Sequence, residues 1–280
     1  DPYRKFWFVD EEQNMWAVGL FFLALGAVIA AILFIRKRCE TTWPLTLAVL
    51  GSLWVALNLF PKTFDMNREF DYFVNSIFVT VLTVIISISI GMLAGYGLAR
   101  YSGLSGAVIL IVALGFRALP RTAFVLPYFY VAKELGILDS RLVIVLALVA
   151  VNQPFTIWML RSFFQSIPQE LDEAARTDGC SHFQAFRRVI VPVMWPGVIT
   201  TGLFSFLLAY NDFLVTSLLL DANNMTMVPA IANMFNRETT ASDEVQAIAA
   251  AVSITAPLFV LVMVFQRQIV SGLTAGAGKG

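Results

Sequence analysis

The sequence predicts an all-α integral membrane protein with about seven transmembrane helices. Hydrophobic residues make up 58% of the 280 residues and charged residues only 14%, whereas an ordinary soluble domain carries about a quarter charged residues. The mean hydropathy is +0.76, and roughly seven apolar runs reach the ~20 residues that a helix needs to cross a bilayer. The 19 basic and 19 acidic residues balance, so no overall positive field indicates a nucleic-acid partner.

The apolar runs give the order of the expected helices. They cover residues 15–35, 43–60, 74–99, 105–130, 141–163, 194–220 and 246–270. Five of the runs carry an internal or near-terminal proline, at Pro44, Pro120 and Pro127, Pro154, Pro196 and Pro257. Prolines are tolerated in membrane helices where neighbouring helices or water satisfy the freed carbonyl groups. The pattern therefore favours a bundle with a polar path over a set of isolated anchors.

Basic residues in the short loops predict the orientation, since cytoplasmic loops carry an excess of Lys and Arg. The cluster Arg36-Lys37-Arg38 follows the first run, which places the N-terminus outside and the C-terminus in the cytoplasm. Both cysteines, Cys39 and Cys180, then lie on the cytoplasmic side, and neither has another Cys or His at a metal-ligand spacing. Neither a disulfide nor a zinc site is expected.

The segment between the fifth and sixth runs predicts two short helices on the cytoplasmic face. Ser166 and Gln169 have the spacing of a capping box, and Pro168 is compatible with a first helical turn. A helix is therefore expected over 167–178. Gly179 follows as the left-handed residue that ends it.

The second helix of this segment is expected to start at Ser181, which has Gln184 as its capping-box partner, and to end before Pro192. Both helices carry small or apolar residues at spacings that share a face. These are Leu171, Ala174 and Ala175 on the first helix and Phe183, Phe186, Val189 and Ile190 on the second. Such a stripe can pack against the protein's own bundle or form the contact surface for a partner.

The same segment contains a spaced motif. It reads Glu173-Ala174-Ala175, then Gly179 after three residues, then Val189, Val191 and Pro192 after nine more. The motif resembles the EAA loop of the permease subunits of binding-protein-dependent ABC importers, in which two coupling helices dock on the cytoplasmic ATPase. The resemblance implies that the ATPase-coupling residues are Glu173, Ala174, Ala175, Asp178, Gly179, Phe183, Phe186 and Pro192.

The resemblance covers roughly residues 70 to 280 and is to the carbohydrate-uptake branch of that family. Its motifs are Asn75-Ser76, Gly95 to Arg100, Pro120, Pro127-Tyr128, Ile167-Pro168, Tyr210 to Phe213 and the tail Gly272 to Gly280, which is similar to that of the MalG-like subunit of a heterodimeric permease. Tyr210 stands where the family has Trp, and residues 1–40 have no counterpart in the usual six-span subunit. The implied organisation is N-terminal transmembrane helices in 1–65, a permease domain in 70–275 with the coupling loop at 166–192, and a cytoplasmic tail at 271–280.

Partners and location also follow from the resemblance. It implies a second permease subunit, two ATP-binding subunits, an external solute-binding protein and the lipid of a bacterial inner membrane, with no nucleic acid. The chain would be no enzyme and would carry no cofactor, because ATP and Mg belong to the partner ATPase. The tail agrees with this, since Lys279 is followed by Gly280 rather than by the Ser or Thr of a phosphate-binding loop.

Ionisable side chains deep in a membrane cost about 2.5–3.5 kcal/mol on insertion scales, so they mark function or internal pairing. Arg117 and Arg121 are four residues apart in the fourth run and are expected on one helical face. For Arg117, a cationic lining of the solute path and an internal contact beside Pro120 both remain open. For Arg121 the internal role is favoured.

Two further polar sets lie within the expected spans. Asn152 and Gln153 precede Pro154, where amides near aromatic rings suit a sugar or clamp two helices, and the clamp is slightly favoured. Asp212 is the only acidic residue within a predicted span and suits solute contact or packing at a permease interface. The residues expected to line the solute path are Arg117, Asn152, Gln153, Tyr210, Asn211 and Asp212.

Two function classes fit a polytopic membrane protein of this kind. A secondary transporter driven by an ion gradient should show a buried carboxylate network and an inverted repeat. The sequence has one acidic residue within its predicted spans and no convincing repeat. The favoured interpretation is a permease subunit that forms half of the path for a sugar, polyol or related solute.

Overall fold

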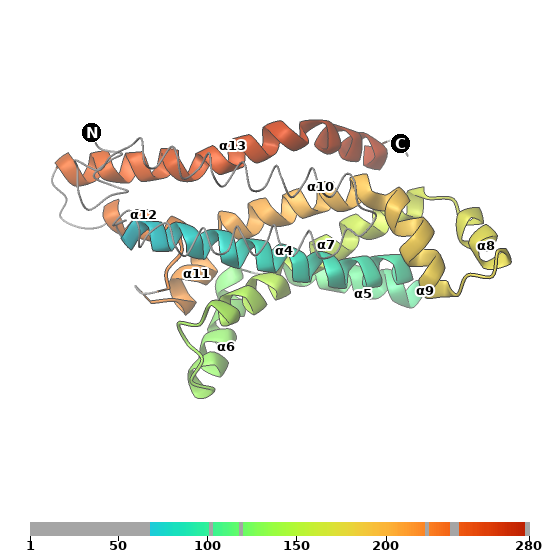
Figure 1. The fold of residues 1–280 in the computed structure, drawn as a ribbon. Coiled ribbons are helices and arrows are strands. Elements are labelled where there is room, and N and C mark those ends of the chain that lie inside the picture. The colour runs from blue at the N-terminus through green and yellow to red at the C-terminus, as the bar shows by residue number, and fades with distance from the viewer. Residues whose placement is uncertain (1–67, 101–102, 118–119, 222–223, 236–240, 278–280) are drawn as a thin grey trace. The chain divides into compact units, whose positions relative to one another are not determined.

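The computed structural model describes residues 68–100, 103–117, 120–221, 224–235 and 241–277, and every regular element in these ranges is helical. The helices are α4 (Arg68–Arg100), α5 (Leu104–Arg117), α6 (Arg121–Glu134), α7 (Arg141–Ser166), α8 (Glu170–Thr177), α9 (His182–Ala185), η1 (Phe186–Ile190), α10 (Val191–Tyr210), α11 (Leu214–Leu219), α12 (Met227–Phe235) and α13 (Ala241–Ala277) (Figure 1). The predicted helices 15–35 and 43–60, the Arg36 to Arg38 cluster with the orientation that depends on it, Cys39 and the last residues of the tail lie outside the described ranges.

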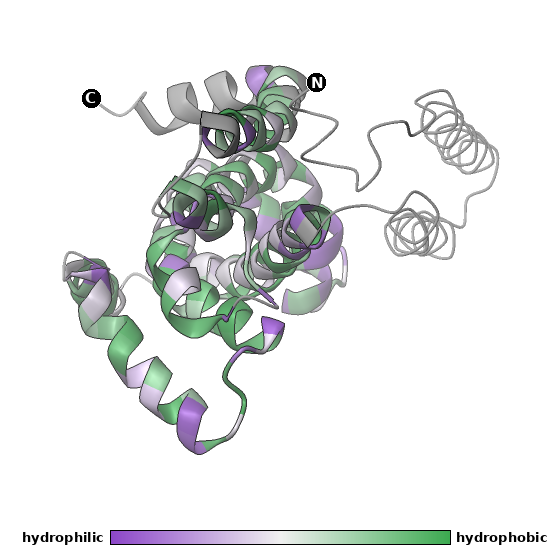
Figure 2. Cartoon of the chain, turned by 90° about the vertical axis from the view of Figure 1, so that its left-hand side faces the viewer, coloured by the Kyte–Doolittle hydropathy of each residue, from purple (hydrophilic) through white to green (hydrophobic). Residues whose placement is uncertain are grey.

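Four of the described helices are long and apolar enough to cross a membrane, and α5 with α6 makes up to a fifth span if the bent pair is counted as one. Figure 2 shows long stretches of these helices in the colour of hydrophobic residues. Apolar runs of about 20 residues predict such spans because a bilayer core is about 30 Å thick. The predicted helices over 74–99, 141–163 and 246–270 are confirmed as parts of α4, α7 and α13.

The fourth run is not one helix, which corrects the expectation for 105–130. The chain bends by 90° between α5 and α6, and Pro120 is the N-cap residue of α6, with a non-helical ψ of 131°. A proline at this position has no N–H to bond back to α5. Arg117 therefore ends one helix and Arg121 starts the next, so the two arginines do not share a helical face as predicted.

The sixth run also differs from its prediction at both ends. Helix α10 stops at Tyr210, and α11 starts only at Leu214. At the other end, α9, η1 and α10 run on without a break, so the helix does not end before Pro192 as predicted. Pro192 cannot donate to the carbonyl four residues back, and the preceding turn widens into a π-helix in which the Val191 N–H bonds to the Phe186 carbonyl. π-helix is rare and occurs mostly as single turns of this kind inside α-helices.

The predicted start and stop signals of the helices in the segment 166–192 are mostly confirmed. Gly179 has a φ of +86° and ends α8, and Ser181 and Gln184 form the expected capping box at the start of α9. Ser166 is the exception, because it is the last residue of α7 and its hydroxyl donates to the Phe163 carbonyl. Helix α8 starts after Gln169, without a side-chain cap.

The described residues divide into two units, one comprising 68–74 and 231–252 and the other comprising 75–230 and 253–277. The second unit contains two hydrophobic clusters. One joins α6, α7 and α11 around Ile144, Leu148 and Val215, and the other joins α4, α7, η1 and α10 around Leu160, Phe164 and Ile190. The second cluster supports the end of the bundle at which α8 and α9 project.

Candidate functional site

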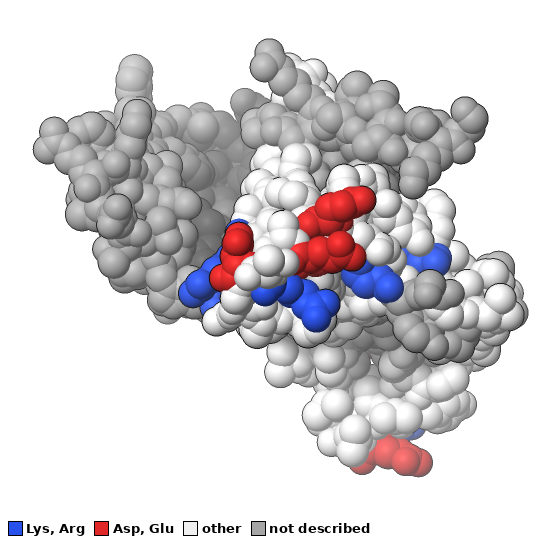
Figure 3. Space-filling model, turned by 90° about the vertical axis from the view of Figure 1, so that its right-hand side faces the viewer, with Lys and Arg blue, Asp and Glu red and all other residues white. Residues whose placement is uncertain are grey.

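The α8–α9 segment, residues 170–185, combines a face turned to its own bundle with a face left open. Ala175 of α8 is buried, and so is Phe186, the first residue of η1 directly after the segment. Glu173, Ala174 and Asp178 are exposed. Phe183 is 63% exposed, and its ring centre lies 6.3 Å from that of Phe186. Figure 3 looks onto this end and shows acidic and basic side chains gathered there. Of the other predicted coupling residues, Gly179 and Pro192 are also exposed.

A charged cluster that the sequence analysis did not find ties α8 to the bundle. The Asp172 carboxylate accepts a hydrogen bond from Arg100 Nε at 2.8 Å, lies 2.7 Å from Arg100 Nη2, and accepts another from the Tyr96 hydroxyl. Arg100 Nη1 donates to the carbonyl groups of Phe164 and Ile167, each at 3.2 Å. Tyr96 and Arg100 were named only as motif residues. Asp172 gave no signal, because an acidic residue in a first helical turn is ordinary.

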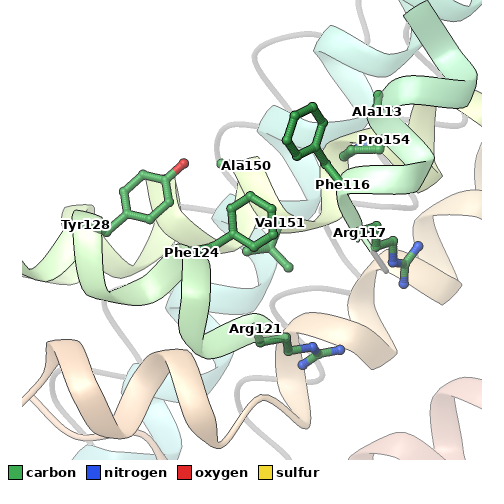
Figure 4. Close-up of a pocket in the computed structure, with 9 residues that line it drawn as sticks. All are labelled: Ala113, Phe116, Arg117, Arg121, Phe124, Tyr128, Ala150, Val151 and Pro154. Carbon is green, nitrogen blue, oxygen red and sulfur yellow. The ribbon is translucent and has the colours of Figure 1, made fainter. Parts of the chain in front are cut away.

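A second feature is a cavity of about 210 Å³ at the bend between α5 and α6. Arg117 lies over the ring of Phe155, with its guanidinium carbon 4.6 Å from the ring centre. Figure 4 shows the Arg117 and Arg121 side chains reaching in the same direction from different helices. The cavity is lined by Ala113, Phe116, Arg117, Arg121, Phe124, Tyr128, Ala150, Val151 and Pro154.

Arg121 and Asp212 form an ion pair, with Nη1 and Oδ2 3.0 Å apart. Asp212 is only 2% exposed and accepts hydrogen bonds from the backbone N–H groups of Val215 and Thr216 at 2.9 and 3.2 Å. It thus caps the start of α11 and places a paired charge in apolar surroundings, where an unpaired one would be costly. This is the internal role that was favoured for Arg121.

The remaining predicted path residues make contacts within the bundle. Gln153 exchanges hydrogen bonds with Ser87 of α4, which is the helix clamp considered above. Tyr210 donates to the Ile254 carbonyl at 3.1 Å, and the side-chain amide of Asn211, the C-cap of α10, donates to the Leu207 carbonyl. Asn152 is 3% exposed, and its amide nitrogen has no hydrogen-bond partner among the described residues. The structure therefore does not bring the six residues together, and only Arg117 lines the cavity.

Comparison with known proteins defines the class and then the family. The chain matches a bacterial ABC transporter involved in the import of the acidic polysaccharide alginate, with a TM-score of 0.60 and 22% identity over 72% of this chain and 75% of that one. The chain thus shares its fold with a chain of that transporter.

Two curated relatives are similar in sequence. The trehalose transport system permease protein SugB of Mycobacterium tuberculosis is 36% identical over 209 residues, 74% of this chain and 76% of that one. The diacetylchitobiose uptake system permease protein DasC of Streptomyces coelicolor is 33% identical over 272 residues, 90% of this chain and 96% of that one. Residues 87–274 match the model of the binding-protein-dependent transport system inner membrane component. The chain belongs to this family, as a permease of the carbohydrate ABC transporter type, and is a transport subunit rather than an enzyme.

Proposed function

We propose that this chain forms half of the translocation path of an ATP-driven importer for a sugar, polyol or related solute. It would pair with a second permease subunit and receive solute from an external binding protein. Two ATP-binding subunits would hold ATP and Mg on the cytoplasmic side. The relatives' trehalose and diacetylchitobiose uptake systems support the solute class.

The observation that carries the proposal is the two-faced α8–α9 segment in a chain of this family. Its exposed residues Glu173, Ala174, Asp178 and Phe183 offer charge, a small surface for close approach and an aromatic anchor, which are features of protein interfaces. Its inner face is fixed to the bundle. Closure of the ATPase pair would bias the bundle between two states open to opposite sides, which is the population shift that alternating access requires.

The cavity at the α5–α6 bend is our proposed solute contact. It has the mixture that sugar sites share, since rings such as Phe124 and Tyr128 offer apolar stacking surfaces and Arg117 offers donors for hydroxyl groups. The Arg117 guanidinium keeps these donors while it lies over Phe155, because a cation–π contact uses the face of the group. Asp212, in contrast, is occupied by Arg121 and the start of α11.

The test of the proposed function is to purify the tagged chain from its native membrane in mild detergent and identify its companions by mass spectrometry. A second permease and an ATPase in fixed ratio are expected. The reconstituted complex with its binding protein should then import radiolabelled trehalose, maltose or diacetylchitobiose only when ATP is inside. A chain that purifies alone and moves solute without ATP would contradict the proposal.

Arg117→Ala should weaken solute handling without loss of the complex. A hydrogen bond to a charged group contributes about 1.5–3 kcal/mol, so the KM for uptake by the reconstituted complex should rise about tenfold or more. Lys133→Ala, which removes an exposed cation from α6 away from the cavity lining, is the matched control and should leave the KM unchanged. Loss of the complex in Arg117→Ala would show instead that the guanidinium is structural.

A further inference from the structure

One side chain, Arg100, connects three helices at the end of the bundle from which α8 projects. It is the last residue of α4, it pairs with Asp172 in the first turn of α8, and it donates to the carbonyl groups of Phe164 and Ile167 at the end of α7. The Tyr96 hydroxyl, one turn earlier on α4, donates to the second oxygen of the same carboxylate. We name Tyr96, Arg100 and Asp172 the joint.

The joint is built from strong interactions. Arg100 Nε donates a charge-assisted hydrogen bond to the Asp172 carboxylate, and such bonds are about twice as strong as neutral ones. The side chains of Arg100 and Asp172 are only 16% and 14% exposed, so salt screens them less than an open surface pair. Each charge also suits its helix, with the cation at the carboxyl ends of α4 and α7 and the anion at the amino end of α8.

Aromatic packing extends the joint to the other arm of the projecting segment. The Tyr96 ring lies 4.8 Å from the ring of Phe186 in η1 and 5.5 Å from the ring of Phe164 in α7. Helix α8 is thus held by the ion pair and hydrogen bonds of Asp172, whereas η1 is held by aromatic contacts. Tyr96 takes part in both, through its hydroxyl and through its ring. Tyr96 of α4 therefore contacts both α8 and η1.

The acidic residues of α8 differ in what they face. Asp172 is turned to the joint, whereas Glu170 and Glu173, on either side of it, are exposed. The joint includes Asp172, in the first turn of α8, which is the helix that we propose as the docking element. Stabilising the bundle alone would not require a residue from α8. Through the joint, a push on the first turn of α8 can reach the ends of α4 and α7.

We propose that the joint is a positioning device, formed by Tyr96, Arg100 and Asp172, that passes movement of α8 to α4 and α7 and so sets how much solute is imported per ATP hydrolysed. This inference rests on the proposed function. With the joint intact, a displacement of α8 must carry the ends of α4 and α7 with it. With the joint open, α8 can move under the ATPase while the bundle stays in place.

The test compares the wild-type complex with Asp172→Asn, which keeps the shape of the side chain and removes its charge. ATP hydrolysis is followed by phosphate release and import by uptake of radiolabelled trehalose, maltose or diacetylchitobiose, whichever the wild type imports. We expect at least a fivefold lower ratio of solute imported to ATP hydrolysed, with both partners still co-purifying. Glu170→Gln, which removes one exposed charge from the same helical turn, is the matched control and should keep the wild-type ratio.

Reversal of the pair adds a rescue. Arg100→Asp and Asp172→Arg alone should each lower the ratio, and the double variant should recover part of it, because opposite charges again face each other. A contact that serves folding alone would lower the yield of complex and leave the ratio of the surviving complex unchanged.

A third, milder variant keeps the proposal testable if the charge-changing variants fail to assemble. Tyr96→Phe keeps the ion pair and removes one hydrogen bond, so the complex should form and the ratio should fall about twofold. An unchanged ratio in both Asp172→Asn and Tyr96→Phe would overturn the proposal. A wild-type chain that has no ATPase partner would instead refute the proposed function, and this is measured first.

Discussion

Glu173→Lys is expected to lower ATP-driven uptake at least tenfold while the chain still folds and inserts. Glu173 is exposed on the open face of α8, and it takes no part in the joint that holds α8 through Asp172. Charge reversal at a protein interface places like charges together, which costs several kcal/mol, and the ~1.4 kcal/mol that corresponds to a tenfold change is well within that range. The amount of ATPase that co-purifies with the tagged chain and the uptake rate are the two measurements.

Glu170→Lys provides the control for this variant. It makes the same change of charge in the same first turn of α8, so any loss that comes from the helix dipole alone would appear in both variants. Only Glu173→Lys should lose ATPase and uptake. Normal uptake by Glu173→Lys would refute the assignment of α8 as the coupling contact.

Gly95→Val is expected to prevent assembly of the bundle and so to remove the chain from the detergent-stable pool. A Cβ atom at Gly95 would lie 3.1 Å from the Arg161 backbone nitrogen and 3.1 Å from the Leu160 Cβ atom of α7. These atoms belong to a packed helix and cannot yield as the end of a flexible side chain would. Small residues allow such close approach of membrane helices, and overpacking of a core typically costs about 1–3 kcal/mol, before the larger valine side chain is placed.

The matched control for Gly95→Val lies two residues further along the same helix. At Gly97 an added Cβ atom would meet nothing within 4 Å, so Gly97→Val changes the same residue type in α4 without a clash. Size-exclusion profiles and thermal unfolding in detergent should show a monodisperse, stable protein for Gly97→Val and aggregation or a strongly lowered melting temperature for Gly95→Val. Equal behaviour of the two variants would contradict the close packing of α4 on α7.

Local patterns predicted the parts of the fold that depend on local chemistry. The helices over 74–99 and 141–163 follow from long, predominantly apolar runs, and the turn at Gly179 follows from a residue that adopts positive φ without strain. The bend at Pro120 and the π-turn before Pro192 were marked by their prolines, but a proline alone does not fix the outcome. It can end a helix, bend it or be absorbed into a wider turn, and neighbouring packing decides among these.

The long-range ion pairs of the two candidate sites could not be predicted from local sequence patterns. Arg100 and Asp172 are 72 residues apart in the chain, and Arg121 and Asp212 are 91 apart. Nothing in either local sequence names the partner, because pairing depends on how α4, α7 and α10 pack. The residue types were still informative, since charges beside apolar spans had to find partners, and for Arg100, Arg121 and Asp212 the structure supplies them.

The unbroken helix from His182 to Tyr210 can carry a displacement from one of its ends to the other. At 1.5 Å per residue, its 29 residues make a rod about 43 Å long. This helix has no loop at which it could fold up under a sideways push, and its two irregular points are the π-turn of η1 and Pro196. It tilts, so a shift of one end appears as an opposite shift of the other end, with a size set by where the pivot lies. The widened turn at η1 lies only a few residues from the end of this helix that follows α8, so a force from the proposed ATPase contact would meet the irregular turn first.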